Sequence, residues 1–261
     1  IDVLNMITKV SRSAEYQGAN YVLFEQSGGF FQFASIESLV DPSKVQPTIT
    51  YLIDPPSGKK NNLRKLTTIL NYKVVALPNI VSNIQSGVYG ATLVSNDLMK
   101  RKVSYSSFNY DESYSKYKSV NYNEVSGSGQ GSTALTNNKS YSQRNNSNLK
   151  FVPKHFGSFD TEKNYADERE DSELIRNSQL RQINAIRLLI IVSGDSQRRV
   201  GEVINIKLPT VEESGGNLDE ILSGRYLVSK VQHSISSIDN QYFTTLEIVK
   251  DSFTNPLPTK A

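Results

Sequence analysis

The sequence contains no cysteine, which excludes disulfide bonds, thiolate zinc sites and cysteine nucleophiles. Its two histidines, His155 and His233, fall in different expected elements, and neither has a paired acid at ligand spacing. A metal site or a Ser-His-Asp triad therefore has almost no candidate residues. No Gly-x-Ser-x-Gly motif surrounds any serine. We predict that the chain is not an enzyme, and we expect no catalytic residue, no cofactor and no metal ion.

Long apolar and basic runs are also missing. The longest apolar stretch near the middle, residues 188–192, is far shorter than the roughly 20 residues that span a bilayer. The net charge of +3 comes from 29 basic and 26 acidic residues scattered along the chain. Nucleic-acid binding would require a basic face, so this balance argues against it.

The length of 261 residues suits one large domain or two modest ones. The chain opens at Ile1 without Met and without the basic, apolar and small-residue regions of a signal peptide. We therefore expect that the numbering starts inside a longer polypeptide and that part of the first domain precedes it.

The first half of the chain alternates between helix and strand patterns. Residues 21–25 and 30–33 are joined by Ser27, Gly28 and Gly29, which predicts a β-hairpin because glycine reaches the positive φ angles of tight turns. Residues 63–77 fit either a helix or a strand. The other predicted elements are a helix over 2–15, a strand over 48–53, a short helix over 79–86 closed by Gly87, and strands within 89–110.

Residues 123–150 are rich in Ser, Asn and Gly and cannot bury enough apolar surface to offset their ordering entropy. We predict a long polar loop there. Acidic residues at 167–173 precede a helical apolar pattern ending near Ile186, an arrangement that the helix dipole favours. Period-2 alternation then predicts four strands, at 188–193, 200–209, 225–235 and 241–250.

Two features could suggest chemistry but have simpler interpretations. The glycine-rich run at 127–131 lacks the strand, the Lys-Ser/Thr pair and the helix of a phosphate-binding loop. The acids at 167–173 could in principle supply the paired carboxylates of a glycoside hydrolase. They share one helix start, however, where solvated acids are ordinary.

Several motifs, taken in order, resemble the central baseplate hub proteins of T-even-like contractile-tailed phages, the tail hub family. The closing strands GRYLVSKVQHSI (224–235) and YFTTLEIVKD (242–251) resemble that family's last hairpin, and VGEV (200–203) its upstream strand. Near the front, NYVLFE (20–25) and GFFQFASIESL (29–39) are similar to its aromatic segments, followed by QSGVYGA (85–91), NDL (96–98) and FNYD (108–111). The residues that carry these motifs are Gly29, Phe30, Phe33, Gly87, Tyr89, Asp97, Gly201, Gly224, Tyr226, Val228, His233, Thr245 and Asp251.

The resemblance implies a β-rich α+β fold with two antiparallel tube-like β-barrel domains, short helices and long polar loops. Residues 1–122 would hold an incomplete N-terminal barrel and the start of the second. Residues 123–150 would form the polar loop, residues 151–255 a helix and the strands completing the second barrel, and residues 256–261 a tail.

The implied function is mechanical. Three chains would form a homotrimeric ring that joins the sixfold tail tube to the threefold central spike in the virion baseplate, assembled in the host cytoplasm. The partners would be the chain itself, the spike protein, a tail tube or tube-initiator protein and the surrounding wedge proteins. The genome would pass through the channel during ejection without specific binding.

Exposed aromatic residues such as Tyr105, Phe108 and Tyr110 are the candidates for subunit contacts, because aromatics dominate interface energetics; an ordinary core role is the simpler interpretation. Two alternatives from other classes remain open: a hub-associated peptidoglycan hydrolase and a glycan-binding adhesin module.

Overall fold

The structure is a computed structural model that describes residues 2–26, 28–53, 66–98, 101–113, 116–121, 123–124, 148–154, 169–210, 218–238 and 240–254. The helices are α1 (Asp2–Val10), α2 (Ile36–Val40), α4 (Ile80–Gln85), α5 (Tyr110–Ser113) and α6 (Arg169–Gln182). The strands are β1 (Tyr21–Gln26), β2 (Phe30–Ser35), β3 (Thr50–Leu52), β4 (Ile69–Ala76), β5 (Gly90–Asp97), β6 (Lys102–Asn109), β7 (Asn123–Glu124), β8 (Asn148–Lys154), β9 (Ile186–Ser193), β10 (Val203–Lys207), β11 (Gly224–Ser236), β12 (Gln241–Lys250) and β13 (Ser252–Phe253).

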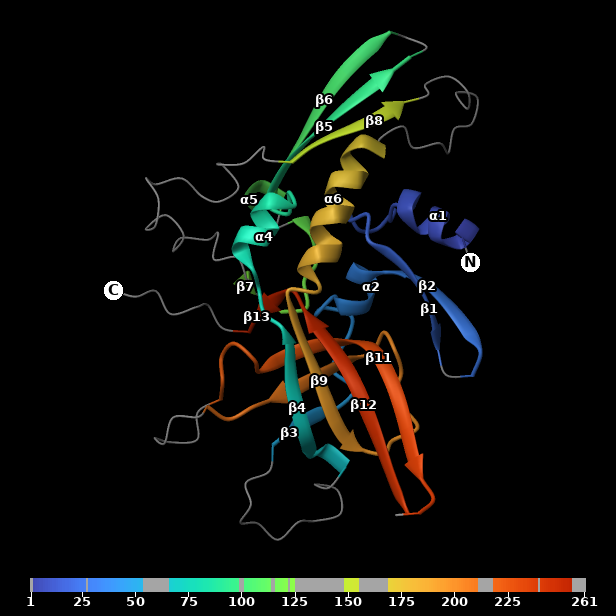
Figure 1. Cartoon of the computed structure of the whole chain (residues 1–261), viewed down its shortest axis with the longest axis vertical. Coiled ribbons are helices and arrows are strands. Elements are labelled where there is room, and N and C mark those ends of the chain that lie inside the picture. Colours follow the sequence, from blue (N-terminus) through green and yellow to red (C-terminus); the bar gives the residue numbers. More distant parts are fainter. Residues whose placement is uncertain are drawn as a thin grey trace, which may run out of the picture.

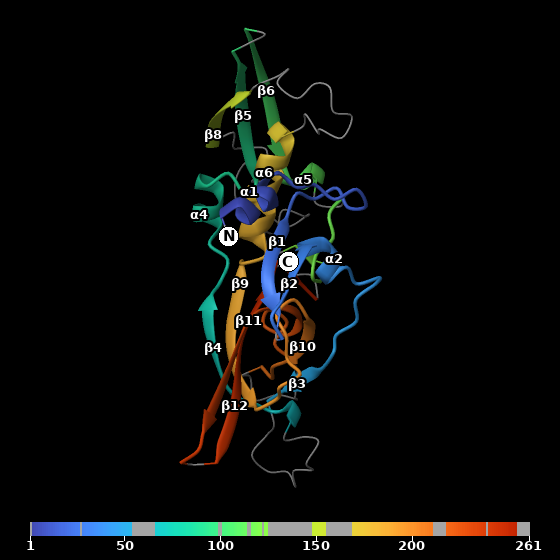
Figure 2. The ribbon, with the colours of Figure 1, turned by 90° about the vertical axis from the view of Figure 1, so that its right-hand side faces the viewer.

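These elements follow one another along a long axis (Figure 1). A six-stranded sheet occupies one end, helices α1, α2, α4 and α6 lie in the middle, and a three-stranded sheet forms the other end. The β1–β2 hairpin stands beside α1 and the larger sheet, as the side view also shows (Figure 2).

The six-stranded sheet has the order β3-β10-β11-β12-β9-β4 and is antiparallel except for the β3–β10 pair. It curls so far that its two edge strands meet: an isolated parallel bridge joins Leu52 to Thr68, the residue before β4. Closing a sheet in this way removes exposed strand edges. Here the two edges meet at that one bridge, and the rest of β4 has no strand on its outer side within the described residues.

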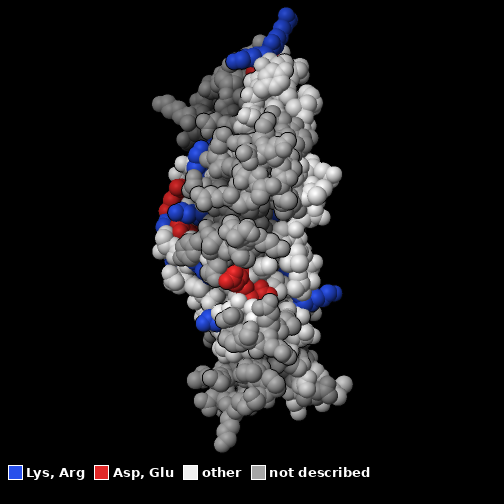
Figure 3. All heavy atoms as spheres, turned by 90° about the vertical axis from the view of Figure 1, so that its left-hand side faces the viewer, with Lys and Arg blue, Asp and Glu red and all other residues white. Residues whose placement is uncertain are grey.

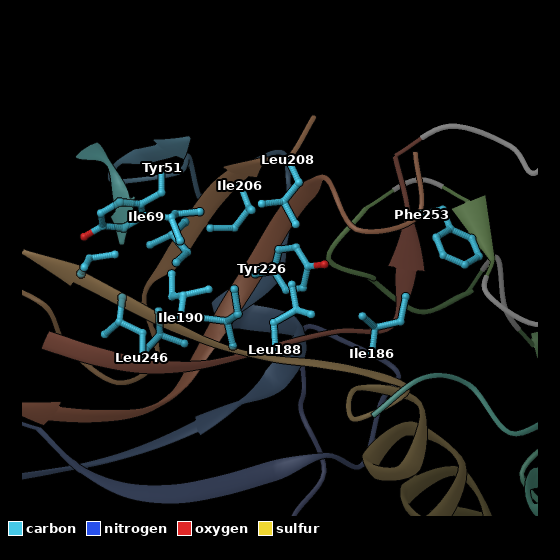
Figure 4. Packing of buried hydrophobic residues seen from close by; sticks show 14 residues of the cluster. Tyr51, Ile69, Ile186, Leu188, Ile190, Ile206, Leu208, Tyr226, Leu246 and Phe253 are labelled. Atoms are coloured by element: carbon cyan, nitrogen blue, oxygen red, sulfur yellow. The ribbon is translucent and has the colours of Figure 1, made fainter. Parts of the chain in front are cut away.

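The interior of this sheet is apolar because apolar side chains occupy every second position along its strands. In β9, every second residue from Ile186 to Val192 is buried and points inward. Residues of β3, β10, β11 and β12 join them, including the two fully buried tyrosines Tyr51 and Tyr226 (Figure 4). Burial of this set accounts for the stability of the sheet, since buried apolar area is the dominant favourable term in folding.

The outside of the same sheet is covered at one end. Val203, Leu227 and Val249 point away from the interior and pack with Ile36 and Val40 of α2 in a second buried cluster. Because β10 is covered on both faces at its start, its adjacent residues Val203 and Ile204 are both buried, and alternation resumes from Ile204 to Lys207.

The three-stranded sheet has the order β6-β5-β8, with β5 antiparallel to β6 and parallel to β8. Helix α6 covers one of its faces. Leu174 of α6 lies in the same buried cluster as Leu93 of β5 and Phe108 of β6.

The β-rich α+β fold class is confirmed. The predicted hairpin and all four C-terminal strands are present, residues 69–76 of the ambiguous segment form a strand, and the first helix ends at Val10 rather than at residue 15. Of the two expected barrels, the described residues form one curled sheet of this kind. It takes β3 and β4 from before the predicted polar loop and four strands from after it. The second barrel and the domain boundaries stay predictions, and most of the 123–150 loop, His155 and the 256–261 tail lie outside the described residues.

Candidate interaction surfaces

The β1–β2 hairpin carries the first candidate surface, which we call the aromatic hairpin: Phe30, Phe31 and Phe33 with Glu25. The turn is built by Gly28 and Gly29, whose φ angles of 104° and 78° suit glycine. Phe30 is 74% exposed and Phe31 69%. The ring of Phe33 stacks on Tyr21 at 4.7 Å between centroids, which fixes the outer side of the hairpin. Exposed aromatics in such a group are typical of binding surfaces.

Two contacts hold the aromatic hairpin against the rest of the molecule. Gly201 has a φ of 88°, and a Cβ atom added there would lie 2.6 Å from the ring of Phe24. Only glycine therefore allows Phe24 to rest on this turn. On the other side, the guanidinium of Arg176 in α6 donates hydrogen bonds to the carbonyls of Ala19 and Tyr21, each at 3.0 Å. The hairpin is thus held at its base by α6 and, nearer its turn, by the segment that leads into β10.

The second candidate surface is the face of the three-stranded sheet that points away from α6. We call it the outer sheet face; it consists of Val103, Tyr105, Leu149 and Phe151. Strand register places Tyr105, Val94 and Phe151 in one row across the sheet. Tyr105 is 75% exposed and Phe151 71%. A sheet face this apolar and this exposed normally has a partner.

Two of the three proposed interface aromatics were wrongly expected to be exposed. Phe108 is 7% exposed and Tyr110 4%, and both belong to the cluster beneath α6. Strand alternation explains the difference, because Tyr105 and Phe108 are an odd number of residues apart and so point to opposite faces. Tyr105 is exposed as expected, and its contact role stays a prediction.

The motif residues between the two sheets form a junction. The backbone of Gly87 adopts a φ of 72°, and a Cβ atom there would lie 2.6 Å from Cβ of Asn148. Tyr89 and Tyr110 meet edge to face at 5.7 Å between ring centroids. Asp97 is buried at the end of β5. Gly87, Tyr89 and Tyr110 fix the start of β5 against β8 and α5, whereas Asp97 lies at the other end of this strand.

The remaining motif residues belong to the curled sheet. Gly224 has a φ of 124°, and a Cβ atom there would lie 2.1 Å from Oγ1 of Thr254. Tyr226 and Val228 point into the interior, and Thr245 is half-buried. His233 is exposed on β11, where its Nδ1 atom lies 3.0 Å from the hydroxyl of Tyr242. The sequence therefore placed these residues in strands correctly, while their family-specific roles stay predictions.

A buried lysine was not foreseen. The side chain of Lys250 is fully buried at the end of β12, and its Nζ atom donates a hydrogen bond of 2.8 Å to the carbonyl of Ser223. It lies 4.7 Å from the ring centroid of Tyr226 and 5.7 Å from that of Phe253. Burial lowers the pKa of this amine to about 7, against the opposing influence of two nearby carboxylates. Strand alternation could have predicted this burial, because Lys250 follows Leu246 and Ile248 at every second position along β12.

Two carboxylates near the middle of the molecule accept backbone hydrogen bonds. Glu37 accepts from the amide nitrogens of Gly18 and Lys118, and burial raises its pKa. Asp251 accepts from the amide of Val120, and burial raises its pKa as well. Each carboxylate ties the 116–121 segment to another part of the chain. Glu37 and Asp251 therefore hold the 116–121 segment in place.

The described residues contain no group of three or more His, Asp or Glu side chains placed to hold a metal ion. The acids at 167 and 168, considered above for hydrolase chemistry, lie outside the described residues. No helix within the described ranges is long and apolar enough to cross a membrane.

No protein-family model matches the sequence, and no curated protein matches it either. Among solved structures, the chain is similar to a tail protein from Neisseria meningitidis MC58, with 8% sequence identity and a TM-score of 0.45 over 88% of this chain and 51% of that one. It is also similar to the 43 kDa tail protein of prophage MuSo2 from Shewanella oneidensis, with 8% identity and a TM-score of 0.46 over 97% of this chain and 54% of that one. The chain spans about half the length of these two proteins.

Proposed function

We propose that the chain is a structural subunit of a phage tail, and more specifically a baseplate hub that forms a ring and adapts the sixfold tail tube to a threefold central spike. The proposal rests on the ordered hub motifs in the sequence and on the surfaces described above. In this role the chain works by assembly and needs no covalent chemistry. The virion tail would be its location, with the spike, the tube or its initiator and the wedge proteins as neighbours.

The observation that carries the proposal is the exposure of large aromatic side chains on two β elements. Phe30 and Phe31 on one, and Tyr105 and Phe151 on the other, are each exposed by more than two thirds. Aromatic side chains in such numbers are enriched at the centres of protein interfaces. A chain built to assemble with other subunits explains this exposure.

The curled sheet adds a second line of support. It closes at one bridge only, and β4 leaves apolar side chains such as Leu70, Tyr72 and Val75 exposed along the open edge. An open edge of this kind invites a neighbouring subunit. Ring assembly would cover it.

The test is the mass of the purified chain by light scattering, alone and with a candidate spike protein, followed by electron microscopy of the particles. We expect a trimeric ring, or a monomer that trimerises when the spike is added. A monomer that ignores the spike would contradict the proposal. If that monomer also clears a cell-wall suspension, the peptidoglycan hydrolase takes its place; if it binds glycan, the adhesin module does.

A further inference from the structure

The aromatic hairpin and the outer sheet face lie on opposite sides of helix α6. Leu174 and Ser178, one helical turn apart, face the three-stranded sheet: Leu174 joins its buried cluster and Ser178 Oγ donates to the carbonyl of Val88 at 2.7 Å. Arg176 binds the base of the hairpin instead. At 100° per residue, Arg176 points roughly opposite to Leu174. Helix α6 packs on the inner face of the three-stranded sheet, so the outer sheet face lies on the side of that sheet that points away from α6.

The two surfaces also differ in charge. The only charged side chain of β1 and β2 is Glu25, which is exposed and stands opposite Phe31 in the strand register. The outer sheet face is bordered at the β5–β6 turn by the exposed Arg101, whereas Lys102 alternates with Ser104 and Phe108 and so projects toward the α6 side of the sheet. Within the described residues, neither Glu25 nor Arg101 forms an ion pair. Basic side chains stand at the end of the molecule that carries this turn, and further down the same view acidic and basic side chains lie side by side (Figure 3).

We propose that the aromatic hairpin of one copy docks on the outer sheet face of the next copy. Phe31 and Phe33 would cover Tyr105 and Phe151, while Glu25 would approach Arg101 at the β5–β6 turn. This inference rests on the proposed function and names the surfaces through which its ring would form. A second copy is the partner that the charges favour, because the chain itself carries both complementary surfaces.

The placement of the surfaces determines the kind of assembly. A contact between two different surfaces is heterologous, and it generates a closed ring when the rotation between neighbours closes. In a twofold dimer, either each surface meets itself or both hairpins dock at once on the partner's outer sheet face. Reciprocal docking needs both surfaces on one side of the molecule, whereas here they lie on opposite sides of α6. Self-contact of the outer sheet face would bring Arg101 toward its own copy, and like charges across an interface oppose association.

Engineered cysteines give a direct test, because the chain has none of its own. Phe31→Cys and Tyr105→Cys would be placed on two differently tagged full-length copies, co-expressed, and treated with a short bismaleimide cross-linker. We expect a covalent species containing both tags. A single chain carrying both substitutions should give a ladder that ends at the ring's own number of subunits.

The controls use equally exposed positions elsewhere. Ile235→Cys lies at the far end of β11, is 78% exposed, and should cross-link with neither partner. Each cysteine variant alone should stay without covalent dimers. If Phe31→Cys links mainly to itself, the heterologous contact is wrong. If the chain forms rings by light scattering but the mixed cross-link is absent, this inference fails while the proposed function stands; a chain that stays monomeric under all conditions overturns both.

Charge reversal provides an independent measurement. Glu25→Lys should shift the ring toward monomer at a given concentration, and combination with Arg101→Glu should restore the ring. Recovery of ring formation in the combined variant would show that the two positions face each other, since either change alone places like charges together. A combined variant that assembles no better than Glu25→Lys alone would overturn the proposed pairing of these charges.

Discussion

The side-chain amide of Asn121 pairs with the backbone of Arg225 as a neighbouring strand would. Its Nδ2 atom donates to the carbonyl of Arg225 at 3.0 Å, and its Oδ1 atom accepts from the amide of the same residue at 3.0 Å. The same amide also donates to the carbonyl of Ser252. Asn121 is buried, so it joins the start of β11 to β13 at a point where no strand supplies these bonds.

Replacing Asn121 with alanine should therefore lower the free energy of unfolding by roughly 2–3 kcal/mol, because it removes two hydrogen bonds to the backbone of Arg225 and one to the buried carbonyl of Ser252. Urea denaturation measures the change. Asn184→Ala is the matched control, since Asn184 is exposed and its amide makes a local bond to Leu180 within the same turn. Equal losses in the two variants would contradict the special role of Asn121.

Two fully buried tyrosines in the curled sheet offer a matched comparison. The hydroxyl of Tyr226 donates to the carbonyl of Leu222 at 2.6 Å, whereas that of Tyr51 has no hydrogen-bond partner within the described residues. Burial of this unpaired hydroxyl raises the pKa of Tyr51 to about 12. Tyr51→Phe should leave stability unchanged or raise it by about 1 kcal/mol, and Tyr226→Phe should lower it by about 1 kcal/mol. Thermal unfolding of both variants tests this, and a loss in Tyr51→Phe would mean that its hydroxyl has a partner, such as a bound water.

Lys250 should make stability depend on pH. Its pKa is about 7 in the folded chain and near 10.5 when exposed in the unfolded chain, so between these values the unfolded chain binds more protons. Linkage then requires stability to rise as the pH increases from about 7 toward 10.5, and to gain nothing from this group below about 7. In Lys250→Met this rise should flatten, because the titrating amine is gone.

The measurement is the urea midpoint of both proteins at several pH values between neutral and moderately alkaline. The difference between the two curves isolates Lys250 from Asp219, Asp251 and the buried tyrosines, which remain in both. Parallel curves would show that the amine stays protonated over this range and that the rings of Tyr226 and Phe253 compensate its burial.

Much of the fold could be predicted because short sequence patterns indicate its helices and strands. The four C-terminal strands follow from alternation, and the aromatic hairpin follows from two glycines between apolar runs. Strand β8 could not be predicted in the same way, because it follows a polar tract, contains Pro153 and pairs in parallel with a distant β5. Because β8 was not predicted, half of the outer sheet face was not predicted either, since Leu149 and Phe151 lie on β8.

The contacts of polar residues were equally hidden. Nothing near Asn121 in the sequence indicates that its amide binds Arg225, because the two residues are brought together only by tertiary structure. Phe108 and Tyr110 were recognised as notable aromatics, but which face they occupy depends on where α6 packs.

The contact between Phe24 and Gly201 can be tested by comparing a substitution at Gly201 with one at Gly29 in the turn of the same hairpin. Gly201→Ala and Gly29→Ala both place a Cβ atom on a backbone with positive φ, which should cost about 1 kcal/mol. Only Gly201→Ala also meets the ring of Phe24, whereas nothing lies within 4 Å of the added atom at Gly29. We expect the larger loss for Gly201→Ala, with faster proteolysis at the hairpin, and partial recovery when Phe24→Leu is added. Equal losses would mean that Phe24 does not rest on this turn.

The two aromatics of β6 should separate folding from assembly. Phe108→Ala removes a ring from the core beneath α6 and should cost roughly 3–5 kcal/mol of stability. Tyr105→Ala removes an exposed ring and should change the free energy of unfolding of the isolated chain by no more than about 0.5 kcal/mol. Light scattering should show the reverse order of effects on ring formation at a temperature where both variants are folded. If Tyr105→Ala assembles normally, Tyr105 is not one of the few anchor residues that carry most of the binding energy of an interface.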